Sequence, residues 1–178
     1  MPMRKLILFI AVMTAASAPG YAQVTIDMSR VTCANYLAMP LDQTRTFSAW
    51  MSGWFNHKKG YISVGLNDFA GNISSIKQFC TTSPGETIMG VLERAYVQPA
   101  VTGQIKVDMS LITCRQYLNS DAERKELIGA WMGGYFRAYT NQSIFDFQRF
   151  KKNTASVQKY CQKNGGETLM SAIQKTAR

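Results

Sequence analysis

Histidine is nearly absent from this sequence, because His57 is the only one among 178 residues. The four cysteines form no C-x-x-C pair, so the chain lacks imidazole and thiolate ligands at the spacing of a zinc site. It also lacks a glycine-rich loop of the kind that holds phosphates. These absences argue against a metal site and predict no cofactor.

Long apolar segments are also scarce, and one stands out near the start. Leu6–Ala16 is about 11 residues long, which is too short for a helix that spans a membrane. It follows Arg4 and Lys5 and precedes a small-x-small sequence that ends at Ala22, as in a cleavable signal peptide. We expect residues 1–22 to be removed and the mature chain to lie in the periplasm. An uncleaved anchor is the alternative.

Acidic residues are few, with 11 Asp and Glu against 20 Lys and Arg and a net charge of +9. A basic balance can indicate nucleic acid, an anionic membrane surface or acidic partners. Here the basic residues are scattered in pairs such as Lys58-Lys59 and Arg124-Lys125 rather than gathered in a tract. This pattern favours a solvated basic surface, and an exported protein rarely meets nucleic acid.

An internal repeat is the most informative feature that is present. A shift of 81 residues places 26–95 on 107–176 without a gap, with about 20 of 70 positions identical. Each copy is therefore predicted to be one folding unit. We expect a first domain over 23–96, a linker over 97–105 and a second domain over 106–178.

The cysteines repeat with the copies. Cys33 and Cys80 are 47 residues apart, as are Cys114 and Cys161. Exported proteins keep disulfides because their compartment is oxidising. Four cysteines allow three pairings. Pairing within each copy is the economical arrangement, because each bridge then closes its own loop and stabilises it by about 4 kcal/mol in the chain-entropy model.

A long helix is predicted in each copy, over about Asp42–Lys59 and Asp121–Thr140, the second beginning with a Ser120-x-x-Glu123 capping box. Their apolar residues recur at helical spacing. Small residues form an Ala-x-x-x-Gly strip on each helix, where another backbone could approach closely: Ala49, Gly53, Ala130 and Gly134. The apolar faces contain Trp50, Met51, Trp54, Phe55, Trp131, Met132, Tyr135 and Phe136.

Capping residues predict the other helices. The first helix of each copy follows an Asp-Met-Ser sequence, and the last begins at Ser83 or Asn164, with Glu86 or Glu167 at its third position. A brief strand at Tyr61–Val64 is a weak alternative, because no hairpin signal follows it. The predicted fold class is all-α, with two tandem small four-helix domains that each contain one internal disulfide joining the first and third helices.

Catalysis has little support in the repeated residues. The second copy has no histidine, so a Ser-His-Asp or Cys-His arrangement cannot occur in both copies. His57 lies beside Lys58 at a predicted helix end, where a cation is favourable. The recurring carboxylates lie at predicted helix starts, where capping explains them. We expect no enzymatic activity, and the aromatic and methionine stripe forms either a core or a binding surface.

The repeated motifs resemble those of the HdeA/HdeB family. Thr32-Cys33-x-x-Tyr36-Leu37 returns in the second copy, as do Trp50-x-x-Gly53 and a second cysteine about 47 residues after the first. The resemblance implies a small all-α periplasmic acid-stress chaperone. Such proteins are folded dimers at neutral pH that dissociate and partly unfold in acid, and then cover denatured proteins with apolar surface while the disulfide keeps the opened chain compact.

The tandem arrangement predicts that one chain forms an intramolecular pseudo-dimer through the Ala/Gly strips of its long helices. The expected partners are acid-denatured periplasmic proteins, bound through the apolar helix faces, without stable membrane insertion. Glu86 and Glu167 are candidate pH-sensitive caps, because a carboxylate at a helix start has a lowered pKa and its contribution is lost in acid. The competing function is a binding or inhibitor module that stays folded.

Overall fold

The computed structural model describes residues 25–95 and 106–176. The expected signal peptide and the whole of the expected linker lie outside these ranges. Within the described ranges, no helix is both long enough and apolar enough to cross a membrane. The fold is all-α with one disulfide in each copy, as predicted.

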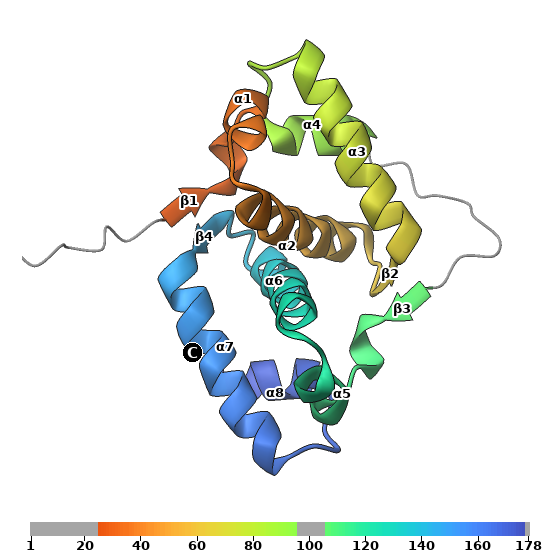
Figure 1. The fold of residues 1–178 in the computed structure, drawn as a ribbon, viewed down its shortest axis with the longest axis vertical. Helices are drawn as coiled ribbons and strands as arrows, with labels where there is room; N and C mark the ends of the chain where they lie inside the picture. The colour runs from red at the N-terminus through yellow and green to blue at the C-terminus, as the bar shows by residue number, and fades with distance from the viewer. Residues whose placement is uncertain (1–24, 96–105, 177–178) are drawn as a thin grey trace, which may run out of the picture.

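The two copies have the same order of elements (Figure 1). The first contains β1 (Thr25–Asp27), η1 (Met28–Arg30), α1 (Cys33–Leu37), α2 (Leu41–Lys59), β2 (Ser63–Gly65), α3 (Leu66–Thr82) and α4 (Ile88–Ala95). The second contains β3 (Lys106–Asp108), η2 (Met109–Leu111), α5 (Cys114–Asn119), α6 (Ala122–Tyr139), β4 (Ile144–Asp146), α7 (Phe147–Lys163) and α8 (Leu169–Thr176).

The disulfides join the first and third α-helices of each copy. Cys33 of α1 bonds to Cys80 of α3, and Cys114 of α5 bonds to Cys161 of α7. All four residues are fully buried. The expected pairing within each copy is therefore confirmed, and each bridge closes a loop that contains the long helix of its copy.

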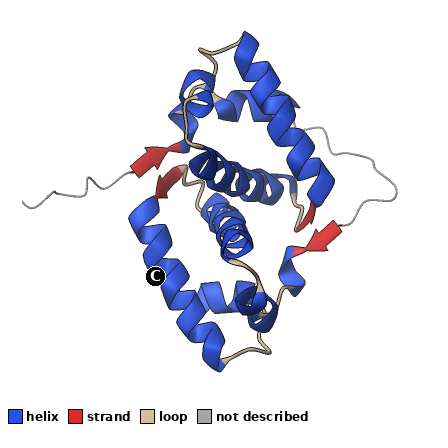
Figure 2. Ribbon diagram, in the orientation of Figure 1, coloured by secondary structure: helices blue, strands red, loops and turns tan. Residues whose placement is uncertain are grey.

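Short strands join the two copies, and β2 overlaps the brief strand at Tyr61–Val64 that the sequence left as a weak alternative. β1 pairs antiparallel with β4, where Ile26 lies opposite Phe145, and β2 pairs antiparallel with β3, where Val64 lies opposite Val107. Figure 2 shows the two pairs on opposite sides of the molecule. Three residues are too few to show a strand pattern, and each partner strand belongs to the other copy, so no hairpin signal precedes it.

The last helices begin later than predicted. α4 and α8 start five residues after Ser83 and Asn164, and the hydroxyls of Thr87 and Thr168 cap them by accepting the backbone N–H three residues later (3.2 and 3.3 Å). The preceding segment is held by the first helix of the same copy, because the N–H of its cysteine donates to the carbonyl of the glutamate (2.7 and 2.8 Å). Because these hydrogen bonds hold the preceding segment outside the helix, each last helix begins after the predicted cap.

Two other predicted caps also differ. Ser120 ends α5, where its hydroxyl donates to the carbonyl of Gln116 (3.0 Å), and Asp121 caps α6 by accepting the backbone N–H of Arg124 (2.7 Å). The Asp-Met-Ser sequences begin the single 3₁₀ turns η1 and η2. Thr32 and Thr113 begin the α-helices instead, each through a capping box.

The hydrophobic core is shared between the copies. Ala130, Ala138 and Phe145 of the second copy pack in a core that is otherwise built from the first copy, together with Trp50. On the other side, Ile62 and Val64 of the first copy pack against the core of the second. Neither copy therefore buries its apolar residues alone.

Candidate functional site

The two long helices, α2 and α6, lie beside each other in the middle of the molecule (Figure 1). They cross at a pair of glycines that the repeat relates to each other. A Cβ atom on Gly53 would lie 1.9 Å from the carbonyl oxygen of Trp131, and one on Gly134 would lie 1.9 Å from that of Trp50. Only hydrogen fits there, so the backbones touch. Because equivalent residues make equivalent contacts, the copies are arranged like the subunits of a symmetric dimer.

Most of the apolar residues expected to bind a client lie inside the folded molecule. Phe136 is the exception, because it is half-buried and lines a pocket of the second copy. Ala49 and Ala130 of the small-residue strips are also buried. The buried members of the expected surface are Trp50, Met51, Trp54, Phe55, Trp131, Met132 and Tyr135. Trp50, Trp131 and Tyr135 lie against residues of the other copy. Met51 and Phe55 instead face α3 and α4 of their own copy.

Some polar atoms of these helices are buried without a partner. The indole Nε1 atoms of Trp54 and Trp131, and Nδ1 of His57, have no hydrogen-bond partner among the described residues. A buried unpaired polar group of this kind costs about 1–3 kcal/mol relative to its hydrated form. Separation of α2 and α6 would return these atoms to water, so the interface is less stable than its apolar area suggests.

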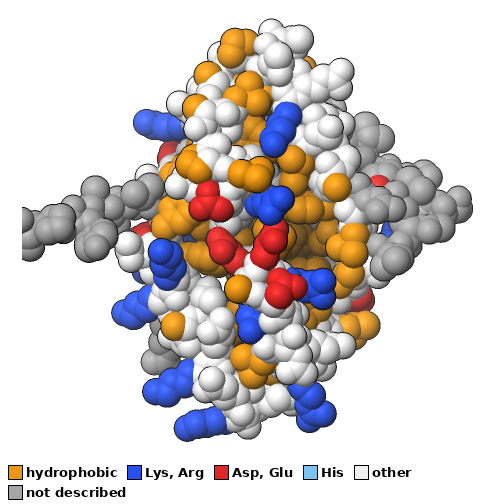
Figure 3. All heavy atoms as spheres, viewed as in Figure 1, with side chains coloured by type: hydrophobic (Ala, Val, Ile, Leu, Met, Phe, Trp, Pro, Cys, Tyr) orange, Lys and Arg blue, Asp and Glu red, His pale blue; other side chains and the backbone are white. Residues whose placement is uncertain are grey.

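Carboxylates bridge the two copies around the crossing. Arg45 Nη1 lies 2.5 Å from Glu123 Oε1, the Thr46 hydroxyl donates to Glu126 Oε1 (2.6 Å), and the Ser143 hydroxyl donates to Asp27 (2.9 Å). Figure 3 shows acidic side chains gathered in the middle of the face that is turned toward the viewer. These contacts could not be predicted from the sequence, because the residues of each pair are 78 to 116 positions apart.

Comparison with known proteins agrees with this two-copy arrangement. The HdeA/HdeB family model matches the chain twice, over residues 3–90 and 91–171. The chain belongs to the HdeA/HdeB family. No curated protein and no solved structure matches it. The family is associated with periplasmic acid-stress chaperones, which are not enzymes. In the described part of this HdeA/HdeB protein, no cluster of three or more His, Cys, Asp or Glu residues could hold a metal.

The carboxyl group of Asp27 in this HdeA/HdeB protein has a lowered pKa. Hydrogen bonds from Ser29 and Ser143, together with the Arg30 charge, hold the pKa of its carboxyl below the ordinary value of about 3.8. A carboxyl group whose pKa is lower in the folded state than in the unfolded state stabilises the fold at pH values above its unfolded pKa. This stabilisation is lost as the pH falls through the folded pKa. Because Ser143 belongs to the other copy, acid weakens a contact between the copies.

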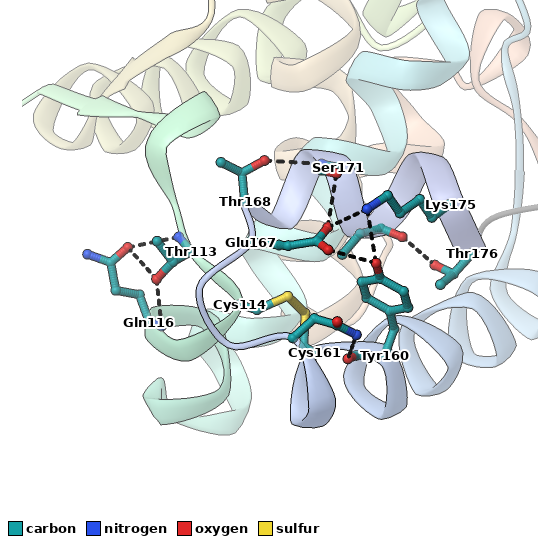
Figure 4. Close-up of a disulfide and its surroundings, with 12 residues drawn as sticks. Thr113, Cys114, Gln116, Tyr160, Cys161, Glu167, Thr168, Ser171, Lys175 and Thr176 are labelled. Carbon is teal, nitrogen blue, oxygen red and sulfur yellow. Dashed lines mark hydrogen bonds and ion pairs between the residues drawn. A yellow bond between two sulfur atoms is a disulfide. The ribbon is translucent and has the colours of Figure 1, made fainter.

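The candidate caps Glu86 and Glu167 differ from each other. Glu86 forms an ion pair with Arg94. Glu167 accepts hydrogen bonds from Lys175 (2.7 Å), Tyr160 (3.0 Å) and the Ser171 hydroxyl (3.2 Å), as Figure 4 shows. The hydrogen bonds from Lys175 and Tyr160 are the main reasons why the pKa of Glu167 is lowered.

Both carboxylates hold a basic side chain of the following helix rather than the backbone groups at its start. The lowered pKa of Glu167 stabilises the fold at neutral pH, and this contribution disappears as pH falls below its ordinary value of about 4.5. We therefore propose Glu86 and Glu167 as pH-sensitive groups. Each acts through an ion pair with Arg94 or Lys175 rather than through the predicted capping of a helix start.

His57 lies against the other copy rather than acting as an ordinary helix-end cation. Its ring contacts Tyr135 and Tyr139 of α6, with centroid distances of 5.0 and 4.1 Å. Burial, and then the charge of Lys58, lower its pKa below the ordinary value of about 6.5. Protonation places a charge between the helices, so the fold loses stability as pH falls from the unfolded pKa through the lower folded pKa.

Replacing His57 by phenylalanine should remove this pH dependence. Phenylalanine keeps the ring contacts but cannot be protonated, so the fall in unfolding free energy between pH 7 and pH 5 should become shallower. One proton contributes at most about 1.4 kcal/mol per pH unit. Urea unfolding at several pH values measures the slope. Lys59→Gln, at an exposed neighbour, is the control and should keep the original slope. An unchanged slope in His57→Phe would show that another group is responsible.

Proposed function

We propose that this protein is an acid-activated periplasmic chaperone whose opening step occurs within one chain. Acid separates α2 from α6, and the apolar faces of both helices then bind denatured proteins and prevent their aggregation. The observation that supports this most directly is the burial of Trp50, Trp131 and Tyr135 at the contact between the copies. The mature chain acts after export, without a cofactor.

Protonation acts on two groups at this contact. Neutral Asp27 no longer accepts a charge-assisted hydrogen bond from the Ser143 hydroxyl of the other copy. Burial and the charge of Lys58 disfavour a charged His57, whose ring lies against Tyr135 and Tyr139 of α6. With all carboxylates neutral, the mature chain carries about 19 positive charges. The resulting repulsion favours the open form and keeps complexes with other positively charged chains soluble.

The covalent link between the copies gives this mechanism a distinctive property. Dissociation of a dimer depends on protein concentration, whereas opening within one chain does not. A short linker also keeps the copies at high effective concentration, so they return to each other when the pH rises. The pH of activation should therefore not depend on protein concentration.

Acid should switch on client binding. At pH about 2–3 we expect the purified mature chain to suppress aggregation of an acid-denatured client and to bind a dye that reports apolar surface, with neither effect at pH 7. Tryptophan fluorescence should follow the same transition, because Trp50, Trp54 and Trp131 are all buried at neutral pH.

The concentration series is the control for intramolecular opening. The midpoint pH of the fluorescence change should stay constant over a hundredfold range of protein concentration, and sedimentation at pH 7 should show a compact monomer. A midpoint that moves with concentration would indicate separate chains as the dissociating units. A native fold at pH 2 without suppression would instead support the module that stays folded.

A further inference from the structure

The two copies differ in the space that lies between their helices. The second copy contains a pocket of about 360 Å³ between α6, α7 and α8, whereas the equivalent space in the first copy is about 30 Å³. Small-molecule sites in proteins are about 300–1,000 Å³ in volume. The repeat therefore provides an internal comparison. The second copy has a pocket large enough for a ligand, and side chains occupy most of the equivalent space in the first copy.

Small residues account for the difference. Gly129 and Gly133 line the pocket of the second copy, where the first copy has Ser48 and Ser52 at the equivalent positions. Thr154 likewise lines the open pocket, where the first copy has the larger Ile73. These replacements remove side-chain volume from two helices that face each other. The glycines also lower helix propensity, a cost that needs some compensation.

The pocket has an apolar base and a basic rim. Tyr117, Val157 and Leu169 are buried and form part of its lining. Arg137 near the end of α6 and Arg149 near the start of α7 also line it. The first copy has Asn56 and Asp68 at the positions of the two arginines, so both the space and the positive charge are specific to the second copy.

We propose that this pocket binds a small amphipathic carboxylate, whose apolar tail lies between α6, α7 and α8 and whose carboxylate pairs with Arg137 and Arg149. The guanidinium group matches a carboxylate through two parallel N–H···O bonds. An apolar tail would gain from burial against the lining of the pocket. This site belongs to the folded state and does not depend on the acid-activated function.

The electrostatics of the rim agree with an anionic ligand. Burial and the charge of Arg149 lower the pKa of Arg137, and these effects outweigh the nearby Asp146 carboxylate, which raises it. Arg137 donates to Gln142, a neutral acceptor that also lines the pocket. A bound carboxylate would add negative charge where two guanidinium groups repel each other.

Calorimetry at pH 7 with decanoate and 1-decanol tests the proposed chemistry. The two probes share a tail and differ in charge, so decanoate should bind one site per chain at least tenfold more tightly than decanol. Arg149→Asp, which installs the residue of the first copy at an exposed position, should weaken decanoate binding at least tenfold and leave decanol unchanged. Equal affinity for the two probes would overturn the carboxylate site.

A second variant tests the pocket itself. Gly129→Ser, Gly133→Ser and Thr154→Ile together copy the residues of the first copy, and decanoate binding should fall at least tenfold. A Cβ atom at either glycine makes only ordinary contacts, the nearest at 3.6 and 3.7 Å, so the variant should fold. Its melting temperature, no lower than that of the original protein, checks this. Retained binding in the folded variant would overturn the proposal.

Backbone NMR locates the ligand within the chain. Decanoate should shift the amide signals of Gly129 and Gly133 and leave those of Ser48 and Ser52 unchanged. Equal shifts in both copies would indicate a general affinity for apolar surface and would overturn the site. Because all measurements are made at pH 7, their result is independent of whether acid opens the molecule.

Discussion

Gly134→Ala should destabilise the folded chain by about 3 kcal/mol, because overpacking of a rigid contact typically costs 1–3 kcal/mol and occasionally more. The new Cβ would lie 1.9 Å from the carbonyl oxygen of Trp50, which belongs to a helix backbone and cannot rotate away as a side chain can. α2 and α6 must therefore move apart. Urea unfolding at pH 7 measures the loss.

The same variant should also act as a chaperone without acid. If the separated helices are the binding surface, Gly134→Ala should bind the apolar-surface dye and suppress client aggregation at pH 7. Gly133→Ala is the matched control, because it adds the same methyl group one residue earlier on α6. Its Cβ would lie 3.7 Å from the Trp50 ring, an ordinary contact. The control should be as stable as the original protein or more stable by about 0.5–1 kcal/mol. Equal behaviour of the two variants would contradict the proposed role of the crossing.

Loss of either disulfide should cost about 4 kcal/mol, the chain-entropy value for a loop that spans 47 residues. We expect Cys33→Ala with Cys80→Ala, or the equivalent pair in the second copy, to lower the unfolding free energy by this amount. Because the cores are shared, loss of one bridge should destabilise both copies together. A single cooperative transition at lower urea concentration is the expected result.

Reduction of the original protein separates the cross-link from side-chain packing. Reduced thiols keep nearly the volume of the disulfide, so a reductant should lower stability as the alanine pair does, whereas the four-alanine variant should not respond to it. In acid, the reduced chain should also have a larger hydrodynamic radius than the oxidised chain. A reduced protein with unchanged stability would show that the bridges contribute little to the fold.

Much of the architecture was predictable because its signals are local or recur at a fixed distance. The shift of 81 residues predicted two equivalent units, and the spacing of Cys33 and Cys80 favoured one disulfide in each. The apolar spacing predicted the long helices, and α2 differs from its predicted range by one residue at its start. The Ala-x-x-x-Gly pattern suggested close packing, and the structure places both glycines where α2 and α6 cross.

The polar and aromatic contacts between the copies could not be predicted in the same way. Glu123 and Glu126 look like ordinary residues of an exposed helix face until Arg45 and Thr46 are placed beside them. His57 looked like a helix-end cation because the tyrosines that cover it belong to the other copy. Each of these environments is made by residues far away along the chain, and a pattern within one segment contains no record of them.

The sequence by itself determined that the chain has two equivalent, cross-linked units with apolar helix faces, because periodicity, caps and cysteine spacing depend on residues within one copy. The tertiary structure decided that these faces partly cover each other and that carboxylates and His57 lie between the copies. It also decided that the pocket between α6, α7 and α8 is larger than the equivalent space in the first copy. The physical reason is that packing depends on complementary volume and charge between segments about 80 residues apart. At this contact, the absence of a Cβ atom on Gly53 and Gly134 allows the two helix backbones to touch.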